Sequence, residues 1–300
     1  MEVTLQVGCA GEANASLAEA LDWETSGKLR PLLDALAPLL QDLEPSRTSY
    51  GAEFCEHLLP SPEALRAVRE ACARPFTLLT PYVGDSGLAM LRALFPVLRA
   101  GDEVIFSDWG VLNVLHREFP ELVPVQGRLL NKSLRDPRVM GLYAEAGPGP
   151  TLTVLQGSNL DNRAYTAMLR RFGVKRAEID GLPQGNDLAT ASMELTACLP
   201  YGFISTARVC QAAGLGYRKG EKFQPAAPCK QECQTFLLEH AYTNSPFENR
   251  DQKFWLKGNS YFYFHTPEIV KALLRAAREG ALARLHLQTR LPMLANGLAA

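Results

Sequence analysis

A complete strand–helix–strand unit can be read from residues 76–107, FTLLTPYVGDSGLAMLRALFPVLRAGDEVIFS. Its ends, Phe76 to Thr80 and Val104 to Ser107, are apolar runs of strand length. Between them, Asp85 can cap a helix. The apolar positions of this helix recur at helical spacing: Leu88, Leu91, Leu94 and Leu98. Strands that alternate with helices in this way predict a parallel sheet covered by helices.

The same alternation continues on both sides of this unit. Further predicted strands are Val3 to Val7, Arg47 to Tyr50, Val123 to Gln126, Arg176 to Asp180, Met193 to Leu199 and Leu282 to Gln288. Helices are predicted after Ser61-Pro62, from Gly110 to His116 and after Thr266-Pro267. Roughly seven or eight βα repeats fit either a doubly wound open sheet or a (β/α)₈ barrel of the TIM type. The barrel is favoured because Gly8-Cys9-Ala10-Gly11 lacks the G-x-G-x-x-G spacing of a dinucleotide-binding turn.

Residues from about 200 to 260 do not continue this rhythm. They are rich in Gly and Pro and hold Cys210, Cys229 and Cys233. We therefore expect three regions: a barrel body over residues 1–200, an irregular cysteine-containing lobe over 201–260, and a strand–helix–strand unit over 261–300. We expect the last unit to close the α/β barrel. The pattern of strands allows either a complete or an incomplete barrel.

Composition limits the classes of protein to consider. The 300 residues carry a formal net charge of −1, and their basic residues are scattered, so nucleic-acid binding is unsupported. The start, Met1-Glu2-Val3-Thr4, does not resemble a secretory signal, and no apolar run is long enough for a membrane span. We expect a cytoplasmic protein, in which seven cysteines argue against a disulfide framework.

Three cysteines of the lobe form a metal-ligand pattern. Cys229 and Cys233 are a C-x₃-C pair in a polar segment, and Cys210 lies before them across a Gly-rich loop. A loop with few apolar side chains can be ordered by a metal that thiolates bind. Four thiolates suit a [4Fe-4S] cluster, whereas a structural Zn²⁺ would take similar ligands. The spacing alone leaves both open.

The fourth ligand is expected from the barrel body. Cys55 follows one predicted strand and Cys210 another, so both should reach the C-terminal face of a parallel barrel. Cys9, which ends the first strand, is the rival to Cys55, and His240 is an alternative ligand for zinc.

The two remaining cysteines, Cys72 and Cys198, are predicted to be small buried hydrophobic residues. One follows the inward face of a helix, and the other lies inside a strand. Neither is expected to bind a metal.

The segment from Leu199 to Cys210, LPYGFISTARVC, followed by Cys229-x₃-Cys233, resembles the collagenase-like peptidase family of unknown catalytic type. Within it, the chain looks like the UbiV/UbiU-like iron–sulfur branch, in which a Gly-Glu-x-x-Cys element follows the second strand. Gly51-Ala-Glu-Phe-Cys55 is similar, with one extra residue. The resemblance implies that Cys55, Cys210, Cys229 and Cys233 hold a [4Fe-4S] cluster.

The resemblance also implies a function. It points to oxygen-independent hydroxylation of the kind used in ubiquinone biosynthesis, by an enzyme or subunit with a small organic substrate and a homologous UbiU-like partner. A peptidase or other hydrolase is the first alternative, although Gln156-Gly157-Ser158-Asn159 is no G-x-S-x-G motif and H-E-x-x-H is absent. A non-catalytic, zinc-stabilised partner protein is the second.

The catalytic residues are not identified from the sequence. The candidates are polar residues that follow predicted strands, because sites of parallel barrels form at strand ends. They are Asp108, Arg128 and Asp180.

Overall fold

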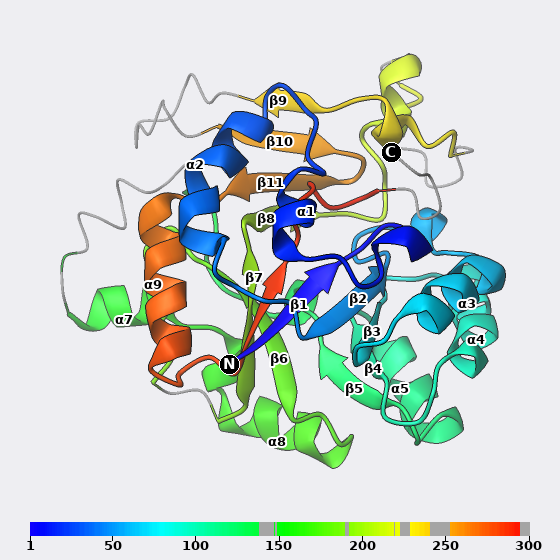
Figure 1. Cartoon of the computed structure of the whole chain (residues 1–300), viewed down its shortest axis with the longest axis horizontal. Helices are drawn as coiled ribbons and strands as arrows, with labels where there is room; N and C mark the ends of the chain where they lie inside the picture. Colours follow the sequence, from blue (N-terminus) through cyan, green and yellow to red (C-terminus); the bar gives the residue numbers. More distant parts are fainter. Residues whose placement is uncertain are drawn as a thin grey trace.

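The computed structural model describes residues 1–137, 147, 149–189, 192–218, 220–222, 229–240 and 253–294. Its centre is a closed barrel of parallel strands in the order β1-β12-β7-β6-β5-β4-β3-β2 (Figure 1). These strands are β1 (Glu2–Gln6), β2 (Arg47–Gly51), β3 (Phe76–Leu79), β4 (Glu103–Phe106), β5 (Val123–Gln126), β6 (Arg176–Asp180), β7 (Glu194–Leu199) and β12 (Arg284–Leu287). The predicted eight-stranded barrel is confirmed and complete.

Helices cover the outside of the barrel (Figure 1). They are α1 (Leu17–Leu21), α2 (Arg30–Leu40), α3 (Pro62–Ala71), α4 (Asp85–Leu94), α5 (Trp109–Glu118), α7 (Pro150–Gln156), α8 (Arg163–Arg171) and α9 (Pro267–Arg278). Two predicted caps are present. The Ser61 hydroxyl accepts the N–H of Ala64 at 3.2 Å, and the Thr266 hydroxyl accepts that of Ile269 at 3.4 Å.

Residues 76–107 form β3, α4 and β4, as their pattern predicts. The predicted cap is wrong: Gly84 is the N-cap of α4, and Asp85 lies in its first turn, where a carboxylate is favourable to the helix dipole. Alternate residues of the strands lie in different apolar clusters. Phe76 and Val104 belong to the main core between strands and helices, whereas Leu79 and Ile105 form a small cluster with Val125 inside the barrel. This alternation is expected for strands that are covered on both faces.

A second sheet lies beyond the C-terminal ends of the barrel strands (Figure 1). Its antiparallel strands run in the order β8 (Tyr201–Thr206), β11 (Ser260–Phe264), β10 (Phe254–Lys257) and β9 (Leu238–His240). Phe203 and Phe262 of this small sheet pack edge-to-face on Phe54, with ring centroids 5.7 and 4.9 Å apart. Aromatic packing therefore joins the small sheet to the loop after β2.

The structure differs from the predicted division of the chain in two respects. The region over 201–260 contains an ordered antiparallel sheet with buried aromatic residues, rather than only irregular loops. The strand at Ser260–Phe264 pairs with β8 and β10 of that sheet, so α9 and β12 close the barrel without it.

The inside of the barrel is polar along its axis. At the N-terminal ends of the strands, Arg284 donates two hydrogen bonds of 2.6 and 2.9 Å to Glu103. Midway, His286 lies between Ser49, at 2.8 Å, and Glu178, at 2.7 Å. An arginine network described below fills the C-terminal end. Barrel interiors usually hold bulky apolar side chains, so the polar and charged side chains at these three heights along the barrel axis are unusual.

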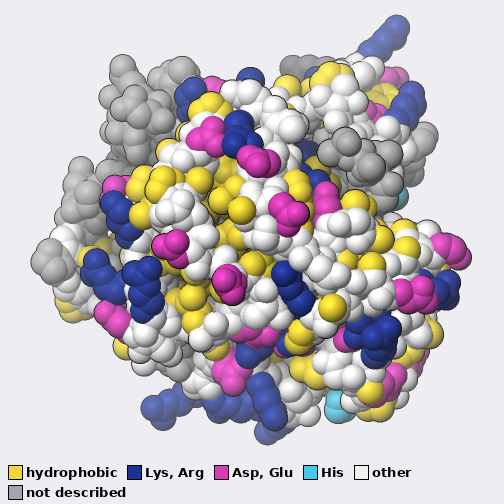
Figure 2. All heavy atoms as spheres, viewed as in Figure 1, with side chains coloured by type: hydrophobic (Ala, Val, Ile, Leu, Met, Phe, Trp, Pro, Cys, Tyr) yellow, Lys and Arg dark blue, Asp and Glu magenta, His cyan; other side chains and the backbone are white. Residues whose placement is uncertain are grey.

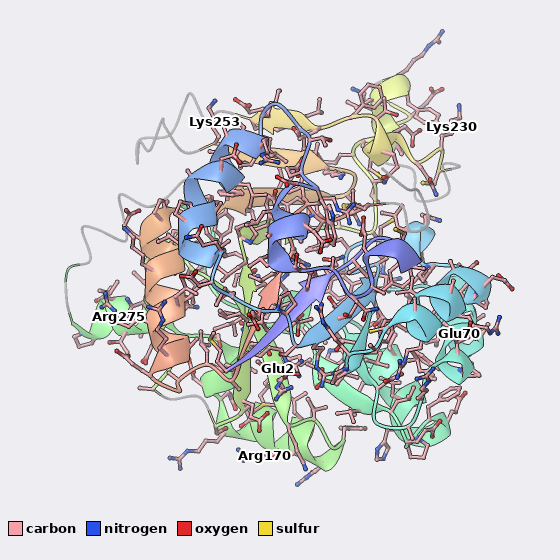
Figure 3. All side chains as sticks on the ribbon, in the orientation of Figure 1. Glu2, Glu70, Arg170, Lys230, Lys253 and Arg275 are labelled. Carbon is pink, nitrogen blue, oxygen red and sulfur yellow. The ribbon has the colours of Figure 1, made fainter. Side chains whose placement is uncertain are left out.

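The face shown in Figure 2 mixes basic, acidic and apolar side chains. Charged residues such as Glu70, Arg170 and Arg275 project from outer helices (Figure 3). In the described part of the chain, no helix combines the length and apolar character needed to cross a membrane.

Candidate metal centre

The loop after β2 positions Cys55. Gly51 ends the strand with φ of +122°, and a Cβ there would lie 2.5 Å from the carbonyl oxygen of Leu79. Glu53 and Phe54 are buried, which fixes the loop against the barrel end. Cys55 then follows in an extended conformation, with φ of −147°.

Cys210 follows β8 of the small sheet and not, as predicted, a barrel strand. Because β8 begins at Tyr201, directly after β7 ends at Leu199, the chain still carries Cys210 to the C-terminal end of the barrel. Its sulfur accepts the N–H of Ala213 at 3.4 Å.

Cys229 and Cys233 flank a tight turn. Gln231 adopts the left-handed conformation, with φ of 56°, and its N–H donates to the Cys229 sulfur at 3.4 Å. The side-chain amide of Gln234 donates to the Cys233 sulfur at 3.1 Å. Such bonds to sulfur favour the thiolate form, which is the form that binds metals.

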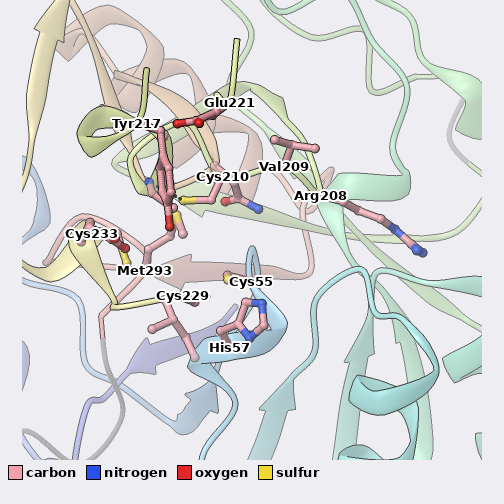
Figure 4. Close-up of a pocket in the computed structure, with 15 residues that line it drawn as sticks. Cys55, His57, Arg208, Val209, Cys210, Tyr217, Glu221, Cys229, Cys233 and Met293 are labelled. Carbon is pink, nitrogen blue, oxygen red and sulfur yellow. Dashed lines mark hydrogen bonds between the residues drawn. The ribbon is translucent and has the colours of Figure 1, made fainter. Parts of the chain in front are cut away.

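All four cysteines line one pocket (Figure 4). They come from three separate segments of the chain, which the barrel end and the small sheet bring together. Other lining residues are His57, Arg208, Tyr217, Glu221, Glu232, Asn259 and Met293. In Figure 4 the side chain of Arg208 extends away from the cysteines. The four residues that the sequence analysis selects therefore meet at one site.

The thiols of this pocket influence one another electrostatically. The pKa of Cys55 is raised to about 12, mainly by burial and to a smaller extent by Cys229, Cys233 and Cys210, against the lowering effect of a backbone hydrogen bond from His57. Burial, and to a smaller extent the neighbouring thiols, also raise the pKa values of Cys210 and Cys233. These thiols are therefore neutral near pH 7 unless a metal displaces their protons.

The sulfur atoms are more widely spaced than the ligands of one small ion. Among the described residues, no three of the four sulfur atoms lie within 4.8 Å of one another. A tetrahedral zinc site with Zn–S bonds of about 2.3 Å would bring them to roughly 3.8 Å. The outer sulfur atoms of a cubane cluster lie roughly 6 Å apart, because each binds a different iron. Four thiols are a donor set for both groups, and the described sulfur atoms are not gathered as closely as the ligands of one bound zinc ion.

The alternative ligands lie elsewhere. Neither Cys9 nor His240 lines the pocket. His240 belongs to β9 and stacks on Phe254 with ring centroids 5.5 Å apart. Cys72 is buried and ends α3, in agreement with its predicted place in the core.

Two of the three candidate catalytic residues are part of a buried ion-pair network. Arg128 is fully buried and donates to both carboxylate oxygens of Glu53, at 2.6 and 2.9 Å, and to Asp180 at 2.8 Å. Its other donors bond the carbonyl of Tyr201 and the side chain of Gln288. All five N–H groups of Arg128 therefore donate hydrogen bonds. Arg128 and Asp180 belong to a structural ion-pair network that fills the C-terminal end of the barrel.

Asp108 lies beside a residue that lines the cysteine pocket. One carboxylate oxygen caps α5 by accepting the N–H of Gly110 at 2.7 Å. The other lies 3.7 Å from a guanidinium nitrogen of Arg208, which lines the pocket. Arg208 also donates to the carbonyl of Val83, so Arg208, which follows β8, is linked to the loops after β3 and β4.

The sequence analysis missed the polar row inside the barrel. Ser49, His286 and Glu178 share hydrogen bonds in the manner of a serine hydrolase triad, yet each is at most 1% exposed. Cys198 is fully buried inside β7, as predicted, and its sulfur lies within 4.8 Å of ligand atoms of Glu178 and His286. The only signal in the sequence was the recurrence of polar residues at alternate strand positions.

No family model matches this chain. No curated protein matches it in sequence. Among solved structures, the chain is similar to the Group IV chitinase of Ostrinia furnacalis in complex with allosamidin, at 9% sequence identity and a TM-score of 0.25, with 96% of this chain and 91% of that chain covered.

Proposed function

We propose that this chain is an iron–sulfur protein that binds a [4Fe-4S] cluster through Cys55, Cys210, Cys229 and Cys233. It acts in the oxygen-independent hydroxylation of a small organic molecule, as an enzyme or as the subunit of an enzyme beside a homologous partner. The cluster requirement is consistent with a reducing compartment such as the cytoplasm.

The observation that carries the proposal is the convergence of four thiols from three chain segments on one pocket. Seven cysteines are present, and the four in this pocket are those that the family resemblance selects. Their wide spacing supports a polynuclear group.

When bound, the cluster supplies one-electron transfer. The chain contributes the surroundings of the sulfur ligands. Backbone N–H groups of Ala213 and Gln231 and the amide of Gln234 donate hydrogen bonds to three of the sulfur atoms. Such bonds stabilise negative charge on the sulfur and raise the reduction potential of the site.

A second pocket shares Cys233 with the cysteine pocket and offers a place for the substrate. It lies at the C-terminal ends of β1 and β12, where active sites of parallel barrels form, and its lining includes Trp23, Lys257 and Arg290. Arg290 lies over the Trp23 ring, 4.5 Å from its centroid. Glu24 also lines the pocket and Arg290 pairs with Glu12, so its cationic groups are balanced by carboxylates. An aromatic wall beside such polar groups suits a small organic molecule.

The hydrolase alternative has less support. A thiol nucleophile needs a lowered pKa, whereas burial raises that of Cys55 to about 12 even though His57 is close in sequence. The hydrogen-bonded Ser49 is 0% exposed, so a peptide substrate has no access to its hydroxyl.

The test is metal analysis of the full chain purified without oxygen. We expect about four irons and four acid-labile sulfides per chain, with a broad visible absorption band. Cys229→Ala should lose iron and sulfide together, whereas Cys72→Ala, which alters a buried cysteine outside the pocket, should keep both. Zinc without sulfide, lost on Cys229→Ala, would instead establish the zinc-stabilised protein.

A further inference from the structure

Three side chains that can bind a metal meet midway along the barrel interior, away from the cysteine pocket. Glu178 of β6, Cys198 of β7 and His286 of β12 lie on adjacent strands, and their ligand atoms are all within 4.8 Å of one another. Each side chain is at most 1% exposed. The register places Cys198 beside His286 and Thr196 beside Glu178.

Several oxygen atoms at this level lack hydrogen-bond partners in the described part of the chain. They are Oε2 of Glu178 and the hydroxyl oxygens of Thr4 and Thr196. Buried carboxylate oxygens are rarely left unpaired in proteins. A proton on His286 would strengthen its 2.7 Å bond to Oε1 of Glu178 but would leave Oε2 without a partner. A cation held by Glu178 would satisfy the second oxygen.

The charges above and below Glu178 along the barrel axis also favour a cation at this height. Toward the C-terminal end of the barrel, arginines and carboxylates balance: Arg128 and Arg135 face Glu53 and Asp180. Toward the N-terminal end they balance again: Arg47, Arg176 and Arg284 face Glu2, Glu103 and Glu194. Between them, Glu178 has no arginine or lysine partner among the described residues. Buried charge needs compensation, and a divalent cation would neutralise the Glu178 carboxylate together with a Cys198 thiolate.

We propose that Glu178, Cys198 and His286 bind one zinc ion inside the barrel. Zinc accepts sulfur, nitrogen and oxygen ligands in one site, as these three residues provide. On zinc binding, Nδ1 of His286 exchanges its hydrogen bond to Oε1 of Glu178 for the ion, and the Glu178 carboxylate binds the ion through both oxygens. The Nε2–H of His286 donates to the Ser49 hydroxyl 2.8 Å away. A hydrogen bond of this kind on the second ring nitrogen is the usual support of a metal-bound histidine.

Zinc uptake releases the proton of Cys198. Burial, followed by the charge of Glu178, raises the pKa of this thiol well above its usual range, so the thiol is neutral in the absence of an ion. Because the site is fully enclosed, zinc enters while the barrel closes.

The position of the site suggests its purpose. β7 ends at Leu199 and β12 begins only at Arg284, because the small sheet and α9 lie between them in the chain. The ion joins β12 to β6 and β7 across this seam. It is therefore a structural ion that stabilises the closed barrel, and it is independent of the cluster.

The test uses the full-length Cys210→Ala/Cys229→Ala variant, which keeps only two thiols of the cysteine pocket. This variant is refolded with zinc or with a chelator, and its zinc content and melting temperature are measured. We expect one zinc per chain and a higher melting temperature with zinc. Adding Cys198→Ser should abolish both effects, whereas adding Cys72→Ser, the same change at a buried thiol elsewhere, should leave both intact.

A second variant covers the case in which the Cys198→Ser protein does not fold. If Cys198→Ser does not fold with chelator present, as judged by circular dichroism, His286→Gln on the same background decides the question by the same two measurements. Equal zinc in the Cys198→Ser and Cys72→Ser proteins, or no zinc uptake by the parent variant, would overturn the proposal. Iron and sulfide in the wild type are measured separately, so the fate of the proposed cluster does not affect this outcome.

Discussion

Arg128 follows a strand and was a candidate for catalysis, but its contacts indicate a structural role. Its guanidinium group is enclosed by two carboxylates, a backbone carbonyl and an amide. Glu53 and then the other nearby acidic groups outweigh the effect of burial and raise the pKa of Arg128 well above its usual range. The charge is therefore permanent.

We expect Arg128→Met to lower the free energy of unfolding by about 3–5 kcal/mol, because Glu53 and Asp180 would remain buried with less compensation. Urea unfolding followed by circular dichroism measures the effect. Arg92→Met, which breaks an exposed ion pair with Glu118, is the control and should change stability little. Equal stability of wild type and Arg128→Met would contradict the structural role.

His265 predicts how stability depends on pH. Burial lowers the pKa of this histidine to about 4, and both ring nitrogens lack hydrogen-bond partners in the described structure. Asp180 and Arg128 act on it with opposite sign. Between pH 6.5 and 4 the unfolded chain binds a proton that the folded chain does not, so stability falls as pH falls through this window.

The contribution of His265 amounts to about 3 kcal/mol at the acid end, from roughly 1.4 kcal/mol per unit of pKa shift. Urea unfolding of the wild type and of His265→Phe between pH 7 and pH 4 isolates this contribution. The variant should lose less stability on acidification. Parallel curves for the two proteins would show that His265 is charged in the folded state.

The fold brings together the four cysteines that were selected from the sequence, whereas their role as cluster ligands stays a prediction. Pattern and resemblance selected four cysteines, and these four line one pocket. The roles of residues inside the barrel were less predictable. A polar residue after or within a strand gives the same sequence pattern whether its side chain faces a ligand or another side chain. Arg128, a candidate for catalysis, is a buried ion-pair residue. Cys198 is buried as predicted, but the sequence did not indicate its polar neighbours.

At the scale of elements, the turn at Gly51 connects the fold to the metal centre. A side chain there would meet the carbonyl oxygen of Leu79 at 2.5 Å, and the φ of +122° disfavours any other residue. Displacement of this turn would move Cys55, which lies four residues later.

We expect Gly51→Ala to destabilise the chain by about 1–3 kcal/mol and to lower the iron content of the purified protein. Gly101→Ala is the matched control, since Gly101 also has positive φ but nothing lies within 4 Å of the added Cβ. It should cost less stability and leave iron unchanged. Equal iron content in the two variants would contradict the expectation that the turn at Gly51 positions Cys55 for metal binding.

The elements that the sequence predicted well are local. The unit over residues 76–107 and the caps at Ser61 and Thr266 depend on nearby residues only, and all are present. The small sheet depends on distant pairing: β8 pairs with β11, and Thr206 lies opposite Ser260. The three- and four-residue strands β9 and β10, and β8, whose partner β11 lies far along the chain, give little periodic signal. This region was therefore predicted to be irregular.

At the scale of the whole molecule, the small sheet covers the C-terminal end of the barrel, and the cysteine pocket lies where the two meet (Figure 1, Figure 4). One wall comes from the loop after β2 and the others from loops of the small sheet. A group bound by all four thiols would therefore join both parts of the fold, and its loss should loosen them together.

The most direct test of this account is X-ray absorption at the iron and zinc edges of the full chain purified without oxygen. We predict iron surrounded by sulfur with short iron–iron neighbours, and loss of this signal in the Cys229→Ala variant. A zinc ion with four sulfur neighbours that is lost in Cys229→Ala, with no iron–iron neighbours in the wild type, would contradict the iron–sulfur cluster.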